Sequence, residues 1–312
     1  MLLPLLVVGG LLTAPLYLGH RSREAHLGLR FPDTPSRDRL TISFDGTATT
    51  FGPHGVPSST TFNSTVTEDV TWQPTSVDQN GVATLRLSVS DVRLSSSGRP
   101  LAARPGTLST MIRVAPDGEM LSAPDAAITS GRGAGTGLPG IAQLAPILPT
   151  RGVRPGASWT KAFVQEVPFG TGRLPVSATN ELVGYQDVKG GMRAAVIRTD
   201  FSIPIDVLLD LARLSPTQAG PTVAYSGRAS LVQMAWLDAR RGRVLKTAGD
   251  GTFDLTLVFR GFPSLFPTFE ALPAAGAVPF GGGPQGSVPG GPERVQLTGR
   301  VQVRLDALDE GS

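Results

Sequence analysis

The chain has 312 residues, 40% of them hydrophobic and 17% charged, which is enough for one large domain or two small ones with a real core. It has no cysteine, and this excludes disulfides, Cys-ligated zinc, thiol catalysis and a lipidated N-terminal cysteine. The net charge of +3 comes from scattered arginines without interleaved aromatic residues, a pattern that does not indicate a nucleic-acid partner.

The first segment, 1–19, is almost entirely apolar and is followed by His20, Arg21 and Arg23. A helix of this length just crosses a bilayer core of about 30 Å. We therefore expect residues 1–26 to form an export signal or a membrane anchor, with the rest of the chain extracytoplasmic, in the cell envelope. The positive charges follow the apolar run, opposite to their place in a standard signal, so cleavage and topology both stay open.

Alternating apolar and polar residues, separated by turn-forming residues, predict antiparallel strands through the first half of the chain. In the clearest strand, Val82–Leu94, the alternation slips by one residue and predicts a bulge near Ser90 and Asp91. Turns are expected at 78–81 and 115–118. The other strands expected here are Arg39–Phe44, Ser64–Trp72, Thr107–Val114 and Glu119–Leu121.

Closely spaced glycines in residues 123–150 predict a linker between two possible halves, 37–125 and 150–308. Strands resume beyond it, at Ala157–Gln165, Val176–Gln186, Arg193–Phe201, Val223–Leu237, Arg243–Phe259 and Val295–Leu305.

One helix is expected at Ile205–Leu214, following Pro204. Val207, Leu208, Leu211 and Leu214 would share its apolar face, and Asp206 and Asp210 would lie together on its solvated side.

Motifs that carry chemistry occur only in incomplete form. Ser158 and Lys161 match a Ser-x-x-Lys pattern but lie on an expected strand, without the companion motifs of penicillin-recognising enzymes. Residues 135–140 satisfy Gly-x-Gly-x-x-Gly, yet Pro139 and the glycine run before it do not fit a dinucleotide site. His54 has no nucleophile elbow to pair with. We therefore predict no catalytic residue, no metal ligand and no cofactor, in a protein that is not an enzyme.

The segment 261–292 is rich in Pro, Gly and Phe and is expected to be a loop. Its rings Phe262, Phe266 and Phe269 are spaced by four and three residues, but prolines between them prevent a long helix. The rings are predicted to gather on one side of the loop. There they cap the open end of the sheet, bind an apolar ligand or contact the membrane.

Several turn-and-strand steps resemble a family of uncharacterised bacterial envelope proteins, many of them lipoproteins. The resemblance spans about 37–260 and rests on a strand, Pro-Asp-Gly, strand step and on three later steps. These steps are Ile112–Glu119, Leu148–Trp159, Leu182–Tyr185 and Asp238–Arg243. It implies a curved antiparallel sheet akin to lipoprotein-carrier half-barrels, and it implies no activity.

Together these observations predict an all-β fold. Residues 27–312 form a single β-rich domain whose large curved antiparallel sheet is either an open half-barrel or two packed sheets, with one or two short helices. The expected function is a non-enzymatic envelope protein, attached to the membrane by its N-terminal segment, that binds an apolar ligand, a lipid or another envelope component. Two alternatives stay open, a structural or protein-interaction domain without a ligand and a hydrolase with unidentified carboxylates. The oligomeric state is not predicted.

Overall fold

The computed structural model describes residues 24–51, 57–101, 108–122, 145–166, 170–188, 192–210, 222–260 and 294–308. All regular secondary structure in this part of the chain is β-strand, which confirms the all-β prediction. The strands are β1 (Ser36–Phe51), β2 (Pro57–Val77), β3 (Ala83–Ser96), β4 (Arg99–Leu101), β5 (Leu108–Val114), β6 (Met120–Ser122), β7 (Ser158–Glu166), β8 (Gly170–Val188), β9 (Met192–Asp210), β10 (Thr222–Asp238), β11 (Arg243–Arg260) and β12 (Arg294–Ala307).

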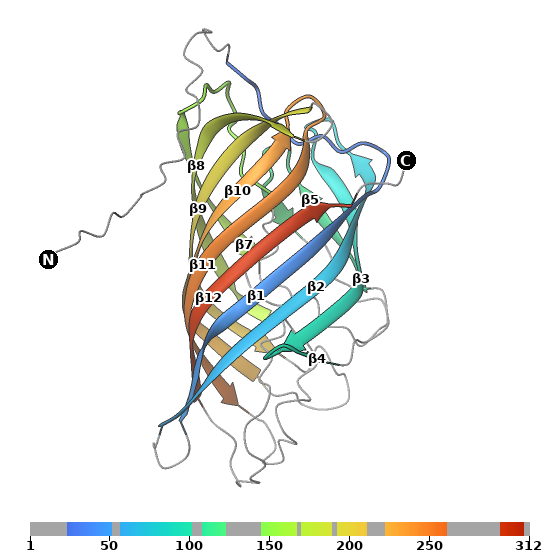
Figure 1. The fold of residues 1–312 in the computed structure, drawn as a ribbon. Coiled ribbons are helices and arrows are strands. Elements are labelled where there is room, and N and C mark those ends of the chain that lie inside the picture. The colour runs from blue at the N-terminus through green and yellow to red at the C-terminus, as the bar shows by residue number, and fades with distance from the viewer. Residues whose placement is uncertain are drawn as a thin grey trace, which may run out of the picture.

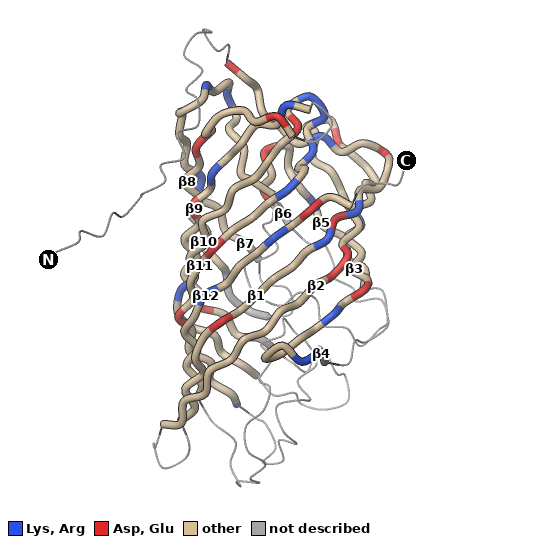
Figure 2. Tube along the Cα trace, in the orientation of Figure 1, with Lys and Arg blue, Asp and Glu red and all other residues tan. Residues whose placement is uncertain are grey.

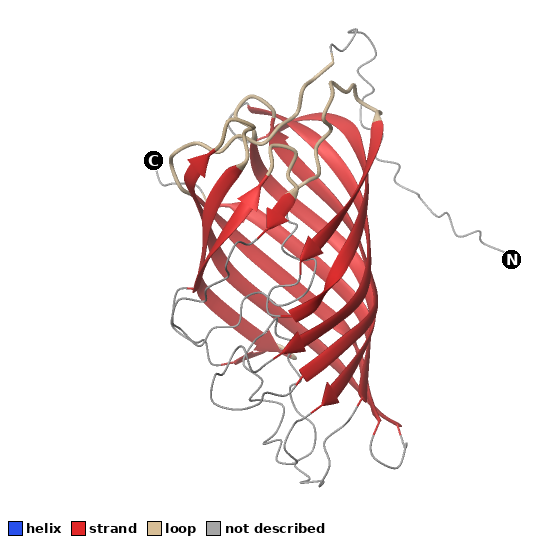
Figure 3. Cartoon of the chain, turned by 180° about the vertical axis from the view of Figure 1, so that it is seen from behind, coloured by secondary structure: helices blue, strands red, loops and turns tan. Residues whose placement is uncertain are grey.

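All twelve strands belong to one curled antiparallel sheet (Figure 1). Their order is β6-β5-β3-β2-β1-β12-β11-β10-β9-β8-β7, with β4 on β3. Strand β1 pairs with both β2 and β12, so strands from the two ends of the chain meet in the middle of the sheet. Seen from behind in Figure 3, the sheet curls into a half-barrel. The half-barrel prediction is therefore confirmed, and the alternative of two packed sheets is wrong.

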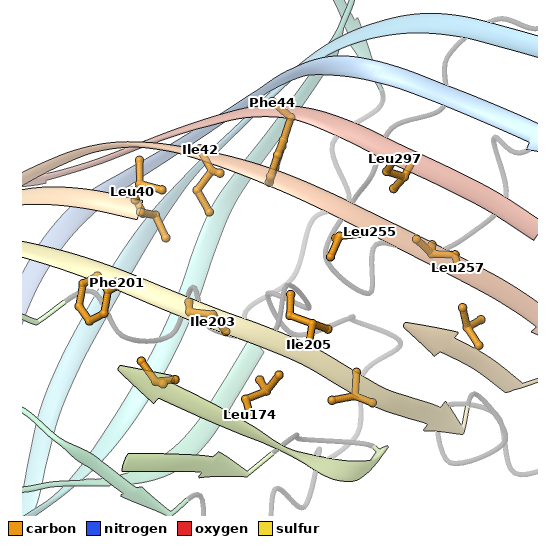
Figure 4. Close-up of a cluster of buried hydrophobic side chains, with 14 of the residues drawn as sticks. Leu40, Ile42, Phe44, Leu174, Phe201, Ile203, Ile205, Leu255, Leu257 and Leu297 are labelled. Carbon is orange, nitrogen blue, oxygen red and sulfur yellow. The ribbon is translucent and has the colours of Figure 1, made fainter. Parts of the chain in front are cut away.

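Side chains alternate between a buried inner face and an exposed outer face, because successive residues of a strand point to opposite sides. On β1 the buried residues Leu40, Ile42 and Phe44 alternate with Arg39 and Asp45, which are exposed. Figure 4 shows such residues from several strands pointing into the half-barrel. Residues directly opposite one another on paired strands share a face, so the pairing of each strand assigns its residues to the inner or the outer side.

Strands β1 and β12 approach closely where two of their glycines lie together. Gly46 of β1 is paired directly with Gly299 of β12. A methyl group on Gly46 would lie 2.3 Å from the carbonyl oxygen of Thr298, and one on Gly299 would lie 2.3 Å from that of Asp45. The backbones of β1 and β12 can approach this closely only because both positions lack a side chain.

A second device is the bulge predicted from the sequence. The β2–β3 register shifts between Thr67 and Asp69, opposite Ser90 and Arg93. Asp91, inside the extra stretch, has a positive φ of 52°. The predicted bulge near Ser90 and Asp91 is confirmed, and it increases the local twist at this point of the sheet.

The predicted helix at Ile205–Leu214 is wrong, because its first part, to Asp210, continues β9. These residues pair with β10, Ile205 opposite Gly227 and Asp206 opposite Ser226. Ile205 and Val207 are buried on the inner face, while Asp206 and Leu208 face outward. The helical and the alternating patterns coincide over this short apolar run, and pairing with β10 decides between them. Residues 211–214 lie outside the described residues.

The upper end of the half-barrel, at turns 78–82, 115–119 and 238–242, is covered by residues 24–35 and 145–157 (Figure 1). The first of these segments is fixed by backbone hydrogen bonds. The amide of Leu29 donates to Pro116 O at 2.7 Å and that of Arg30 to Gly242 O at 2.9 Å. The covering side chains, with the inner residues beneath them, form a separate apolar cluster that includes Leu27, Leu29, Leu148, Val153, Leu182 and Ile197.

The predicted membrane segment, most of the linker and the Phe-rich loop fall on 1–23, 123–144 and 261–293, outside the described residues. Within the residues that are described, the structure has no helix of the length and hydrophobicity needed to cross a membrane.

The glycine pair gives a test of the curl. We expect Gly299→Ala to lower the free energy of unfolding by about 1–3 kcal/mol, because its Cβ would meet the backbone of β1. The midpoint of urea unfolding, followed by circular dichroism, measures this. Gly28→Ala is the matched control, since its Cβ would have only an ordinary contact of 3.8 Å with Pro116 O. Equal losses in both variants would show that the close approach at Gly299 has no special role.

Candidate ligand-binding face

The candidate site is the inner face of the half-barrel below the cover of its upper end. It is lined by aliphatic and aromatic side chains from strands on both sides of β1, and Figure 4 shows several of them converging. The labelled residues are Leu40, Ile42, Phe44, Leu174, Phe201, Ile203, Ile205, Leu255, Leu257 and Leu297. The strand ends at Phe51, Arg260 and Arg294 define the lower end of this face.

Some inner-face residues keep part of their surface exposed. Leu231, Phe253 and Val301 are only partly buried, although they pack against the buried cluster. Phe253 contacts the rings of Phe44 and Phe62, with ring centroids 6.2 Å and 6.4 Å apart. Phe62 and Phe253 lie over the glycine pair, so aromatic surface rather than backbone is presented to the interior at this close approach.

The inner face also carries a row of polar side chains on β8, β9 and β10. Asn180 lies opposite Thr199, and Thr199 lies opposite Gln233. The Thr199 hydroxyl donates to Asn180 Oδ1 at 2.8 Å, and Asn180 Nδ2 donates to the Trp159 and Ala178 carbonyl oxygens. Asn180 and Thr199 therefore satisfy one another, as buried polar groups normally do.

Two inner-face hydroxyls lack such partners. Ser64 Oγ and Thr247 Oγ1 are buried, and neither has a hydrogen-bond partner among the described residues. Ser64 lies opposite Phe44 and Thr247 opposite Leu305, both apolar core residues. A buried hydroxyl without a partner is unfavourable, so these two atoms are positions at which a bound molecule would find a hydrogen bond.

Two carboxyl groups also face inward. Glu68 of β2 is only 4% exposed and lies directly opposite Leu40. Burial raises the pKa of Glu68 to about 7. Asp38 of β1 is a diagonal neighbour of Glu68, and burial raises the pKa of Asp38 to about 6, although Arg243 and a hydrogen bond from Trp72 oppose this shift. Both carboxyl groups therefore stay protonated to a higher pH than is usual for glutamate and aspartate.

The outer face is polar and carries ion pairs. Asp69, the residue after Glu68, accepts hydrogen bonds from Arg37 at 2.6 Å and Arg39 at 2.9 Å. These bonds and charges outweigh burial and lower the pKa of Asp69. In Figure 2 both signs of charge are interspersed along the strands. A shallow depression on this side, at Arg228, Asp254 and Gln296, is polar and open.

The two edges of the sheet meet at a seam between β6 and β7. Lys161 of β7 forms ion pairs with Asp117, in the turn before β6, and with Glu119, the residue directly before β6. Burial alone would lower the pKa of Lys161, but the bonds and charges of these two carboxylates raise it. The Trp159 indole donates to Ile147 O at 3.0 Å, which places this ring at the start of β7 against the cover. The seam is therefore held by side chains at its upper end.

The structure places the sequence candidates as follows. Phe262, Phe266, Phe269, His54 and the glycine motif at 135–140 lie outside the described residues. Ser158 is exposed and Lys161 is held in ion pairs, so their Ser-x-x-Lys pattern does not form a nucleophile and base pair.

Sequence reasoning missed Glu68. The signal that identifies it is its place in the alternation of β2, between Ser64, Val66 and Val70, which all share its face. That phase becomes decisive only once the pairing with β1 is known.

Comparison with known proteins adds no identity: no family model matches the chain, and no curated protein is recognisably similar to it.

The seam gives a second test. We expect Lys161→Met to lower the free energy of unfolding by about 1–3 kcal/mol, because Asp117 and Glu119 would be left half-buried without their cation. Arg198→Met is the control, since the Arg198–Asp200 pair is exposed on the outer face and its loss should be unresolvable. Urea unfolding of both variants measures the difference, and an unchanged midpoint for Lys161→Met would refute the role given to the seam.

Glu68 gives a test in pH. Its pKa is about 7 in the folded protein and 4.5 for an ordinary glutamate of the unfolded chain, so the folded state binds the proton more tightly. The contribution of Glu68 to stability is therefore complete below about pH 4.5 and is lost as pH rises through about 7. A shift of this size corresponds to about 3 kcal/mol. Asp38 acts in the same direction over a lower range, up to about pH 6.

As pH rises from about 5 to about 8, we expect the free energy of unfolding to fall clearly less in Glu68→Gln than in the unchanged protein. Urea midpoints measured across this range test the expectation. Asp254→Asn, at an exposed outer position, should keep the original slope. The assignment is wrong if Glu68→Gln and the unchanged protein lose stability in parallel.

Proposed function

We propose that this protein is a non-enzymatic binding protein of the cell envelope that holds an apolar ligand, of lipid type, against the inner face of its half-barrel. The observation that supports this most directly is the contrast between the two faces. Most inner-face residues of β1, β8, β9, β11 and β12 are apolar, while the outer face carries ion pairs on β9 and β12.

The width of the sheet also favours a ligand. Closed sheets of eight strands already hold side chains or one small ligand in their interior. Here eleven strands follow one another along the curl, so a larger inner surface has to be covered. The cover formed by 24–35 and 145–157 serves the upper end. A lipid chain would suit the apolar inner face below this cover, because burying hydrocarbon stabilises by about 25 cal/mol per Å².

The position of the Phe-rich segment is consistent with the same site. It connects Arg260 of β11 to Arg294 of β12, which end next to each other at the lower end of the inner face. Phe262, Phe266 and Phe269 begin within two to nine residues of Arg260 in the sequence. We retain them as proposed contacts of the ligand, together with the proposed membrane attachment through residues 1–26.

The experiment uses phenylnaphthylamine, an uncharged apolar dye whose fluorescence rises in an apolar site. We expect the full chain to bind it saturably, and Leu231→Gln to weaken binding by about ten-fold, because a polar group would face the interior. Val232→Gln is the matched control, since Val232 is the next residue on β10 and is 43% exposed on the outer face.

Saturable binding that only Leu231→Gln weakens supports the proposal. Absence of binding, or equal loss in both variants, would reject the inner face as a ligand site and would favour a structural or interaction domain.

A further inference from the structure

Glu68 stands out among the buried groups of this protein. It is 4% exposed and points to the inner face, and its carboxyl group makes no hydrogen bond or ion pair with any described residue. Its inner-face neighbours Leu40, Ile42 and Val70 are apolar. By contrast Asp69, the next residue, is held by two arginines on the outer face. The Asp69 carboxylate therefore has hydrogen-bond partners, whereas the Glu68 carboxyl has none among the described residues.

Unpartnered hydroxyls accompany this carboxyl on the same face. Ser64 is four residues before Glu68 on β2, about 13 Å along the strand at 3.3 Å per residue. Thr247 lies three strands away, across Leu305 and Leu40. Ser64 Oγ and Thr247 Oγ1 have no described partner either. The inner face therefore presents three separated polar groups without a described partner, in addition to the bonded Asn180 and Thr199 and to Asp38. This pattern matches a ligand with polar atoms and not a pure hydrocarbon.

We propose that Glu68 hydrogen-bonds to the uncharged polar group, an acyl ester or hydroxyl, of a lipid held in the half-barrel. This inference rests on the proposed function and names the chemical class of its ligand. It assigns Glu68 as the residue that distinguishes such a lipid from a plain hydrocarbon.

The charges around Glu68 favour an uncharged group. Asp38 on β1 is a diagonal neighbour of Glu68 on the inner face, and its carboxylate would repel an anionic headgroup. Arg243 on β11 already interacts with Asp38. Lys161 on β7 is held by Asp117 and Glu119, and the pKa of Tyr225 on β10 is raised to about 12 by burial. The inner-face residue Val89 of β3, opposite Val70, carries no charge, and neither do Val303 and Leu305 of β12, which lie beyond β1.

A neutral carboxyl can donate to an ester carbonyl and accept from a hydroxyl at once. Because burial raises the pKa of Glu68 to about 7, this neutral form is available at near-neutral pH. The amide of a glutamine has the same two capacities, whereas leucine has a similar volume and neither capacity.

The test is displacement of bound phenylnaphthylamine from the full chain by dioleoylglycerol, which has esters and a hydroxyl, and by squalene, a hydrocarbon. We expect Glu68→Leu to weaken dioleoylglycerol binding about ten-fold and to leave squalene binding within two-fold. Glu68→Gln should keep dioleoylglycerol binding near its original strength. Melting curves of both variants control for folding, and neither should melt earlier, because each removes a buried ionisable group.

The outcomes separate this inference from the function on which it rests. Failure of the unchanged protein to bind the dye rejects the proposed function. If the dye binds and dioleoylglycerol displaces it equally well from the unchanged protein and from Glu68→Leu, the ligand is apolar and the role of Glu68 is overturned. Stronger displacement by oleylamine than by dioleoylglycerol, increasing above about pH 7, would also overturn it, because the group recognised would then be a cation. Loss of squalene and dioleoylglycerol together would show a general packing role for Glu68.

Discussion

The pairing of β1 with β12 is the constraint on which the structure depends. It joins strands from the two ends of the chain, and its register places Gly46 against Gly299. Because the side chains of a strand alternate with a period of two, a slip by one residue would turn Leu40, Ile42 and Phe44 outward. The close backbone approach at the glycine pair opposes such a slip, since any other residue there would meet a carbonyl oxygen. Curl and inner face are thus fixed by the same contact.

An inner face of this kind has to reconcile apolar burial with the polar groups it contains. Asn180 and Thr199 do so by bonding to each other and to nearby carbonyls. Glu68, Ser64 and Thr247 do not, and each contributes an unfavourable term to folding. Selection for stability alone would favour apolar residues at these positions, because replacing buried ionisable groups by hydrocarbon often stabilises. The lipid ligand proposed above would account for their presence on one face.

Much of this fold follows from the sequence, because alternation and turn residues are local signals. They locate the long strands, the bulge beside Asp91 and the turns at 78–81 and 115–118. The error at Ile205–Leu214 arose where an apolar run fits both periods, and only the pairing with β10 resolves it. Glu68 and Asp69 show the same limit for the site. They are adjacent acids, both buried, and only the register of β1 with β2 shows that Glu68 faces inward while Asp69 faces two arginines.

The seam between β6 and β7 differs in kind from the other junctions of the sheet. Each neighbouring pair along the sheet is joined by a ladder of backbone hydrogen bonds, whereas the two edge strands are not paired with each other in the described structure. At the upper end they are linked through Lys161 and its two carboxylates, and the indole of Trp159 bonds β7 to the cover at Ile147. Separating side chains at this seam breaks fewer hydrogen bonds than separating any long ladder, since a ladder carries about one bond per residue. The ion pairs of Lys161 with Asp117 and Glu119 therefore oppose separation at the junction of the sheet that has the fewest backbone hydrogen bonds.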